Sequence, residues 1–199
     1  MKKLTLAIAT SVLIATPFAV MADGATIAKD KCAACHGENG NSSDEKVPSI
    51  AGFSIDGLVD MINEYKSGDR TGDKYTPKDG EETDMNAVTK DMSDDDIKAV
   101  SEFFAGKEFK PAEQAADADL AAAGAKIHDK SCEKCHSDGG QSSEDDTAIL
   151  AGQWKPYLTE QFEEFSSGDR DMPKKMKKKF SKLSDEDKPA LLEYYASQK

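Results

Sequence analysis

The chain contains few of the residues from which small proteins usually build a core or a disulfide scaffold. Its 199 residues include four Cys, one Trp and three His, and aromatic residues make up 7%. Four Cys are too few for a dense disulfide framework. With 38% apolar residues, a chain long enough for one domain or two small ones has little side-chain material for two cores. We therefore expect something other than side chains to complete them.

Positive charge is also scarce. Lys and Arg number 26 against 38 Asp and Glu, which gives a formal net charge of −12. Such an excess of negative charge is repelled by phosphate backbones and by anionic lipid. We therefore expect neither nucleic acid nor an anionic membrane as the main partner.

Long hydrophobic runs are confined to the N-terminal segment. Two lysines precede a mostly apolar stretch, Leu4 to Val20, which ends in small residues with a cleavage point after Ala22. This order is typical of a secretory signal peptide at 1–22. An uncleaved membrane anchor is the alternative, although the run is short and interrupted. The mature chain from Asp23 has no membrane span and is expected to be exported.

The mature chain matches itself after a shift of 100 residues. Cys32-Ala33-Ala34-Cys35-His36 falls on Cys132-Glu133-Lys134-Cys135-His136, and Ser67-Gly68-Asp69-Arg70 falls on Ser167-Gly168-Asp169-Arg170. Beyond these motifs the shift drops to 91, because nine extra residues form a surface loop within Gly72 to Gly80. The pattern predicts two homologous domains, at 23–106 and 120–199, joined by a linker at 107–119.

Each repeat has the apolar spacing of helices rather than the alternation of strands. One helix face is expected at Ile55 to Ile62, and its counterpart at Tyr157 to Phe165. Ser93 and Ser184 each precede an Asp by three residues and are expected to cap the last helix of their repeat. The sequence therefore predicts an all-α protein with three to five helices per domain.

Cys-x-x-Cys-His is the attachment signature of c-type haem. Two Cys three residues apart point to one side of a helix, where both thiols can add to the vinyl groups of one porphyrin. The His that follows can turn its imidazole to the iron. Two covalently bound haem c groups are therefore predicted. The predicted attachment residues are Cys32, Cys35, Cys132 and Cys135, and the predicted iron ligands from the motifs are His36 and His136.

Two other uses of these Cys pairs were weighed. A thioredoxin-like dithiol would need a strand–helix context, which the sequence lacks. A zinc site shared by all four Cys would leave both motif His residues unexplained. Haem attachment accounts for every Cys and for two of the three His.

A sixth iron ligand is expected from Met, a regular axial partner of His. Met85 and Met176 occupy the same place in the two repeats, seven residues before the aligned pair Met92 and Leu183. We predict Met85 as a ligand of the first haem and Met176 as a ligand of the second. Met172 is an open alternative to Met176, and Met92 is expected to be a packing residue.

Two further residues lie near the second motif. His128, four residues before the first Cys of that motif, is expected to face solvent, and replacement of Met as an axial ligand is the alternative. Trp154 is expected to pack in the core or against the haem. Neither is assigned a chemical role.

An iron with both His and Met ligands has no vacant coordination position. Such a centre suits electron transfer rather than substrate chemistry. A haem peroxidase or a gas-binding module would need one iron open or easily opened. The paired Met85 and Met176 therefore argue against both classes.

These residues resemble the dihaem cytochrome c4 family, in which two class I cytochrome c domains follow each other. Within that group the chain is similar to the cytochrome subunit of flavocytochrome c sulfide dehydrogenase. The segments that carry this similarity are Gly124 to His136, Ile149 to Trp154, Lys174 to Met176, Tyr195 to Gln198 and, in the first repeat, Pro48 to Ala51.

The resemblance implies an electron-transfer protein of the periplasm rather than an enzyme. In that family a flavoprotein dehydrogenase subunit oxidises sulfide, its flavin reduces the two haems, and these reduce a soluble acceptor cytochrome. A free shuttle to a terminal oxidase is the alternative. The resemblance also implies that the Pro48 carbonyl orients His36. The second repeat has Ala148 there, whose carbonyl can still accept a hydrogen bond from His136.

Charge divides unevenly between the repeats. Residues 23–106 carry a net charge of −10, whereas residues 120–199 carry −2. Acidic residues surround Met85, and five Lys surround Met176. We hypothesise that the two haem faces dock different partners, because local charge steers encounter. Two ordinary solvated surfaces are the alternative.

Overall fold

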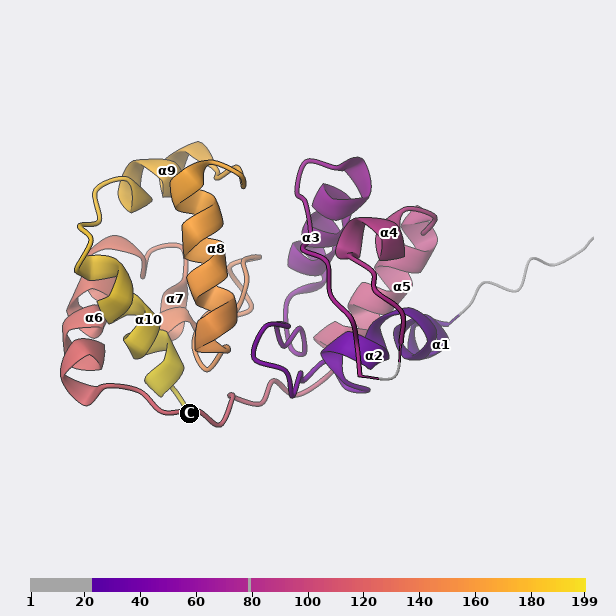
Figure 1. Cartoon of the computed structure of the whole chain (residues 1–199), viewed down its shortest axis with the longest axis horizontal. Helices are drawn as coiled ribbons and strands as arrows, with labels where there is room; N and C mark the ends of the chain where they lie inside the picture. Colours follow the sequence, from indigo (N-terminus) through magenta and orange to yellow (C-terminus); the bar gives the residue numbers. More distant parts are fainter. Residues whose placement is uncertain (1–22, 79) are drawn as a thin grey trace, which may run out of the picture.

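The computed structural model describes residues 23–78 and 80–199. The predicted signal peptide, 1–22, lies outside the described residues. Figure 1 shows two groups of helices, one from each repeat, joined by an extended segment. Within the described residues the only β-type pairing is one isolated bridge between Tyr75 and Thr83. The prediction of an all-α protein is confirmed.

The first group contains the shorter helices. Before the first haem motif the helix widens into a π-helical stretch, and α2 ends at His36 itself. Its elements are α1 (Gly24–Ile27), η1 (Ala28–Cys32), α2 (Ala33–His36), α3 (Ile55–Ser67), α4 (Met85–Thr89) and α5 (Asp94–Ala105). The predicted capping box is present, since Ser93 and Asp96 exchange hydrogen bonds at the start of α5.

The second group repeats this order with a longer first helix. Its elements are α6 (Ala118–Ser131), α7 (Ser137–Gly140), α8 (Lys155–Ser167), α9 (Lys174–Phe180) and α10 (Asp187–Ser197). Ser184 and Asp187 also exchange hydrogen bonds, as predicted, although α10 begins only at Asp187. None of the described helices has the length and apolarity that a bilayer crossing would need.

In each group the first and last helices cross at a glycine. A Cβ added to Gly24 would lie 2.0 Å from the Ala99 carbonyl oxygen on α5, and one added to Gly124 would lie 2.0 Å from that of Ala190 on α10. Only glycine allows two backbones to approach so closely. These crossings bring each haem motif, at the end of the first helix, against the last helix of its domain.

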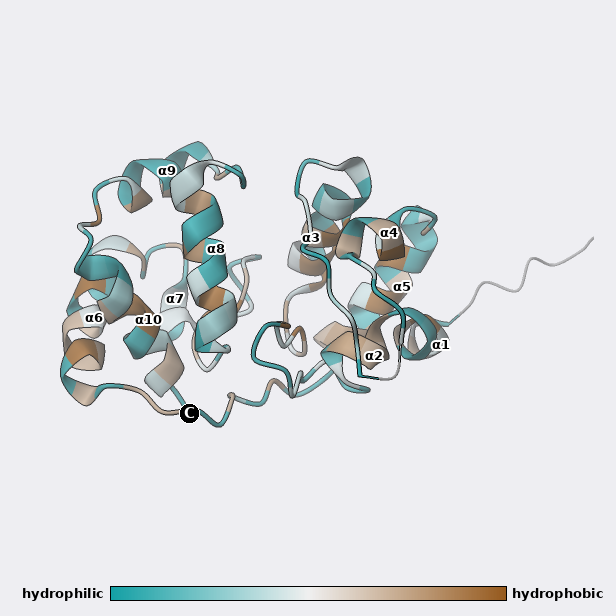
Figure 2. Ribbon diagram, viewed as in Figure 1, coloured by the Kyte–Doolittle hydropathy of each residue, from teal (hydrophilic) through white to brown (hydrophobic). Residues whose placement is uncertain are grey.

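Each last helix buries its expected apolar face. Ile97, Val100 and Phe104 are buried on α5, and α10 buries Leu191, Leu192 and Tyr195. Figure 2 shows hydrophilic residues beside hydrophobic ones on these helices. The buried clusters are small, particularly the second, which consists of Leu158 and those three residues of α10. Two cores of this size are consistent with a bulky apolar group in each domain.

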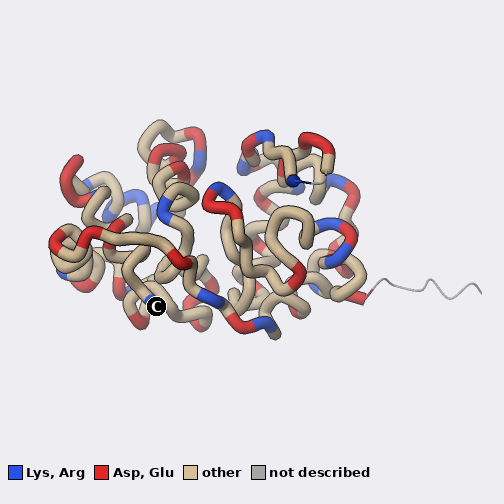
Figure 3. The backbone as a smooth tube through the Cα atoms, turned by 60° about the horizontal axis from the view of Figure 1, so that its bottom comes forward, with Lys and Arg blue, Asp and Glu red and all other residues tan. Residues whose placement is uncertain are grey.

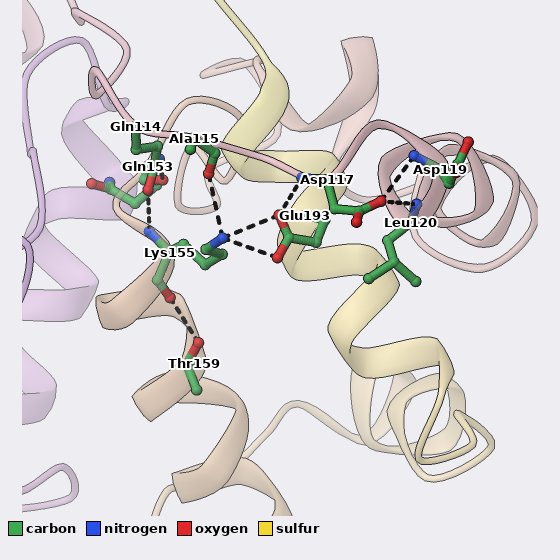
Figure 4. A network of polar contacts seen from close by, with 9 residues as sticks. All are labelled: Gln114, Ala115, Asp117, Asp119, Leu120, Gln153, Lys155, Thr159 and Glu193. Atoms are coloured by element: carbon green, nitrogen blue, oxygen red, sulfur yellow. Dashed lines mark hydrogen bonds and ion pairs between the residues drawn. The ribbon is translucent and has the colours of Figure 1, made fainter.

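The segment between the domains is held by hydrogen bonds to both of them. In the first domain, Asn41 bonds with the backbone of Glu108 and Lys110. In the second, the Gln114 amide donates to the Gln153 carbonyl and accepts from the Lys155 N–H, both visible in Figure 4. The segment is therefore fastened to the surface rather than hanging free between the helix groups.

The two domains also contact each other directly. The side-chain amide of Gln153 donates to the Ser49 carbonyl and accepts from the Ser49 N–H, both at 2.8 Å. Ile149 joins the buried cluster of the first domain. Trp154 donates from Nε1 to the Ser42 carbonyl at 3.0 Å, so it bonds across the domain boundary. The expectation that Trp154 packs inside a core or against a haem did not foresee this contact.

Candidate haem sites

The first candidate site is organised around a buried histidine. His36 is the last residue of α2, and its Nδ1 donates to the Pro48 carbonyl at 2.9 Å. This bond fixes the ring and leaves Nε2 available to a metal. Burial lowers the pKa of His36, so its imidazole is held in the neutral form that ligates iron. The expected role of Pro48 is present in the structure.

The Cys residues of the motifs are unsuited to dithiol redox chemistry. No two of the four are joined as a disulfide within the described residues, and burial raises the pKa of Cys32 to about 11. Burial also raises the pKa of Cys35 and of Cys132. Reactive redox dithiols need the opposite shift, toward thiolate. The thioredoxin-like alternative is therefore disfavoured.

A shared zinc site is not formed either. Across 23–78 and 80–199, no three His, Cys, Asp or Glu side chains converge as a set of metal ligands. The two motifs instead lie in separate helix groups, each beside a small core. Two thiols and one neutral imidazole beside each small core are the chemistry that one covalently attached haem requires.

The second candidate site supports its histidine differently. His136 Nδ1 lies 3.3 Å from the Thr147 hydroxyl oxygen, which in turn lies 3.3 Å from the Cys135 carbonyl. The hydroxyl can accept from the ring and donate to the carbonyl at once. The Ala148 carbonyl, which the sequence left open as the acceptor, does not take this role, because the hydroxyl of the preceding residue lies at the ring nitrogen. Burial lowers the pKa of His136 as well.

The two predicted Met ligands lie in the first turns of equivalent short helices. Met85 is the first residue of α4 and Met176 is the third residue of α9, and both are partly buried. Met92 is buried in the first core, as expected of a packing residue. Met172 lies before Pro173, outside α9. The assignment of Met85, Met176 and the two motif His residues as iron ligands stays a prediction.

The expectation for His128 is wrong. Its side chain is 0% exposed, and Nε2 donates to a Glu133 carboxylate oxygen at 2.7 Å. Nδ1 lies 3.0 Å from the Tyr195 hydroxyl. The hydrogen-bonded partners make burial of a polar ring possible, since a buried polar group without partners is costly. His128 is part of the second domain's interior.

Sequence reasoning missed the residues that join the domains. Arg70 is buried, and with Arg170 it donates to the same Gln161 amide oxygen; the Arg170 bond measures 2.7 Å. Arg70 Nε is buried without a partner among the described residues. The repeat shows that Arg70 and Arg170 end identical Ser-Gly-Asp-Arg motifs. It does not show that both side chains bond to one glutamine.

Comparison with known protein families agrees with this arrangement. Residues 21–106 match the family model described as "Cytochrome c", and residues 119–194 match "Cytochrome C oxidase, cbb3-type, subunit III". Each helix group therefore matches its own cytochrome model. The chain carries two covalently bound haem c groups, one at each Cys-x-x-Cys-His motif.

Known proteins are similar to this chain over both helix groups. Cytochrome c4 of Azotobacter vinelandii is 29% identical over 150 residues, 70% of this chain and 69% of that protein. Reduced recombinant cytochrome c4 from Pseudomonas stutzeri has a TM-score of 0.71 and 25% identity, covering 88% of this chain and 97% of the other. Thiosulfate dehydrogenase (TsdBA) from Marichromatium purpuratum has a TM-score of 0.69 and 25% identity over 88% of this chain, but only 40% of its own chain is covered. The chain therefore consists of two cytochrome c domains in tandem and is similar over most of its length to dihaem cytochrome c4, an electron-transfer protein.

Proposed function

We propose that this cytochrome is the haem subunit of a periplasmic flavoprotein dehydrogenase that oxidises sulfide. The bound haems supply the electron-carrying irons. The chain attaches them through its four Cys, orients His36 and His136, and closes the remaining positions with Met85 and Met176. In this proposal residues 1–22 are a cleaved signal peptide, and 23–106 and 120–199 are the haem domains on either side of the 107–119 linker. Flavin binding and sulfide chemistry belong to the partner.

The observation that carries the proposal is an uneven distribution of charge at the two predicted Met ligands. The Lys residues of α9 that flank Met176 are all exposed, and none takes part in an ion pair within the described residues: Lys174, Lys175, Lys177, Lys178 and Lys179. Exposed acidic residues flank Met85, among them Glu81, Glu82, Asp91, Asp94 and Asp95. Figure 3 marks the acidic and basic positions along both domains. Two faces of opposite charge suit a protein that receives electrons from one partner and delivers them to another.

The sulfur chemistry has two supports. The second-repeat segments quoted above resemble the subunit of a sulfide dehydrogenase. A structural neighbour is, by its name, a thiosulfate dehydrogenase, although it is much longer than this chain. The competing proposal is a free cytochrome c4-like shuttle to a terminal oxidase, which the likeness to cytochrome c4 over 88% of this chain and 97% of the other favours.

Size fractionation of native periplasm separates the two proposals. Haem and flavin absorbance are followed together across the fractions, with chemical cross-linking before lysis to retain weak complexes. Flavin that elutes with this chain, above its own mass, supports the flavoprotein subunit, and sulfide is then the first electron donor to test. A cross-linked sample with haem at the mass of the chain alone and no flavin supports the shuttle.

The docking faces are tested by charge reversal. The triple variant Lys174→Glu, Lys175→Glu, Lys178→Glu is expected to slow electron exchange with one partner at low salt by about tenfold or more, because steered association depends on local charge. The control reverses Lys110, Lys126 and Lys130, exposed residues outside α9, for the same change in net charge. Equal slowing with both partners, or no slowing, would contradict separate docking faces.

A further inference from the structure

The interior of the second domain contains a closed polar network. Its centre is His128 on α6, whose ring packs beside those of Tyr194 and Tyr195 on α10, with centroids 5.3 and 5.5 Å away. Glu133 binds Nε2, and the Tyr195 hydroxyl lies at Nδ1. Figure 1 shows α6 and α10 beside each other in the second domain. Every polar atom of the buried ring has a partner.

The first domain has no such network at the equivalent place. By the repeat alignment, Ala28, Ala33 and Phe104 stand where the second domain has His128, Glu133 and Tyr195. Ala28 and Phe104 are buried in an apolar cluster, and the helix crossing forms without any polar contact there. The fold therefore does not require the network. Three coordinated polar replacements in one interior point to a chemical role.

The network lies beside the second haem attachment. The Tyr195 hydroxyl hydrogen-bonds with Cys132, and Glu133 stands between the two Cys of the motif. The Glu133 carboxylate also accepts from the backbone N–H groups of Asp138 and Gly139, at 3.1 and 3.2 Å, in the turn that follows the motif histidine. A charge placed on this network therefore lies beside the residues that would hold the second haem.

Other charged groups surround the network. His136 lies near enough to His128 for their charges to interact. The positive charge of Lys179 on α9 acts against the burial that raises the pKa of Cys132, and burial together with the negative charge of Asp129 on α6 raises the pKa of Tyr194. Of these groups, the fully buried His128 is the one held by hydrogen bonds at both ring nitrogens.

Two protonation states of His128 satisfy every bond in the network. With a neutral ring, Nε2–H donates to Glu133 and the Tyr195 hydroxyl donates to Nδ1. With a protonated ring, Nδ1–H donates to the Tyr195 oxygen, and the hydroxyl hydrogen turns to the Cys132 sulfur. Glu133 is 40% exposed and connects the ring to solvent. A proton can therefore enter and leave without stranding a buried donor.

We propose that the His128–Glu133 pair is a proton-binding site coupled to the redox state of the second haem. When the partner delivers one electron and ferric iron becomes ferrous, the site loses one positive charge, and a proton from solvent binds to Nδ1 of His128. Oxidation releases both the electron and the proton. The second haem thereby becomes harder to reduce as pH rises, whereas the first domain has Ala28 and Ala33 at the equivalent positions and lacks this proton-binding pair.

The test compares the reduction potentials of the wild type and of His128→Gln between about pH 5 and 8. Gln keeps a donor for Glu133 but does not titrate. In the wild type one of the two midpoints is expected to fall with pH, at most tenfold in the reduction equilibrium per pH unit, which is about 59 mV for one electron. In His128→Gln that slope is expected to be lost, and the other midpoint is expected to keep its wild-type behaviour.

A matched pair of tyrosine variants distinguishes coupling from packing. Tyr195→Phe removes the hydroxyl that accommodates both states and should reduce the slope, whereas Tyr194→Phe removes a neighbouring hydroxyl and should keep it. If His128→Gln loads haem poorly, the triple variant His128→Ala, Glu133→Ala, Tyr195→Phe recreates the first-domain interior and should also be flat. A slope that persists in either His128 variant, or a wild type without any slope, overturns the proposal.

Discussion

The sixth ligand of each iron is assigned to a single side chain, so single substitutions can test it. Met176 is predicted because it matches Met85 in the repeat, and Met172 is its competitor. Met176→Ala is expected to abolish the absorption band of Met-ligated iron at one of the two haems, because the thioether is removed. Absorption spectroscopy of the oxidised protein measures this change, and Met172→Ala serves as the matched control. Loss of the band in the control, with retention in Met176→Ala, would exchange the two assignments.

Side chains of the haem motifs could be predicted because their spacing is set by the porphyrin. The partners of those side chains could not. At His136 the hydroxyl of Thr147 takes the place of a backbone carbonyl. His128 resembles a surface residue in the sequence, because its two partners, one of them 67 residues away, are not evident there.

Gln153 stands where the first repeat has Phe53. This replacement of an apolar residue by an amide was the available signal for the contact of Gln153 with the other domain.

Helices and their caps followed from the sequence more closely. The capping pairs at Ser93 and Ser184 and the buried faces of α5 and α10 were predicted from local patterns. The glycine at each helix crossing was not, because nothing nearby in the sequence reveals a backbone 2.0 Å from a missing Cβ. The equal positions of Gly24 and Gly124 in the repeat were the signal.

The crossing of α6 and α10 provides a prediction at the scale of elements. Gly124→Ala is expected to lower the free energy of unfolding by about 1–3 kcal/mol, because the added methyl group forces the two helices apart. Urea unfolding of the haem-loaded protein measures the loss. Gly106→Ala is the control, since its added Cβ would meet nothing closer than 3.6 Å and its φ is −77°. Equal losses in both variants would show that the close approach does not limit stability.

The contact between the two domains is a property of the whole molecule and could not be predicted from the sequence. It depends on pairs about 100 residues apart, such as Gln153 with Ser49, that no local pattern marks. The repeat itself predicted two similar domains but no contact between them. Charge counts for each half likewise gave no sign that Arg70 would be buried against the other half.

One contact between the domains should respond to pH. A hydrogen bond with Asp73, together with partial burial, raises the pKa of Glu160 to about 7. Because this pKa is raised above its unfolded value of 4.5, the stabilisation is complete below about pH 4.5 and is lost as pH rises through about 7. Glu160→Gln is therefore expected to match the wild type near pH 4.5 and to exceed its urea midpoint at pH 8. Glu163→Gln, an exposed neighbour on α8, should follow the wild type at both pH values; a Glu160→Gln protein that does the same would refute the prediction.

The two hydrogen bonds between Gln153 and Ser49 affect how the two halves can evolve and be engineered. Ser49 directly follows Pro48, whose carbonyl holds the ring of His36. The metal environment of one half thus rests on a side chain encoded in the other. Although the halves arose as copies, they are no longer modules of equal independence. A gene fragment for the first half alone would encode His36 and Pro48. It would lack Gln153, which holds Ser49 directly after Pro48.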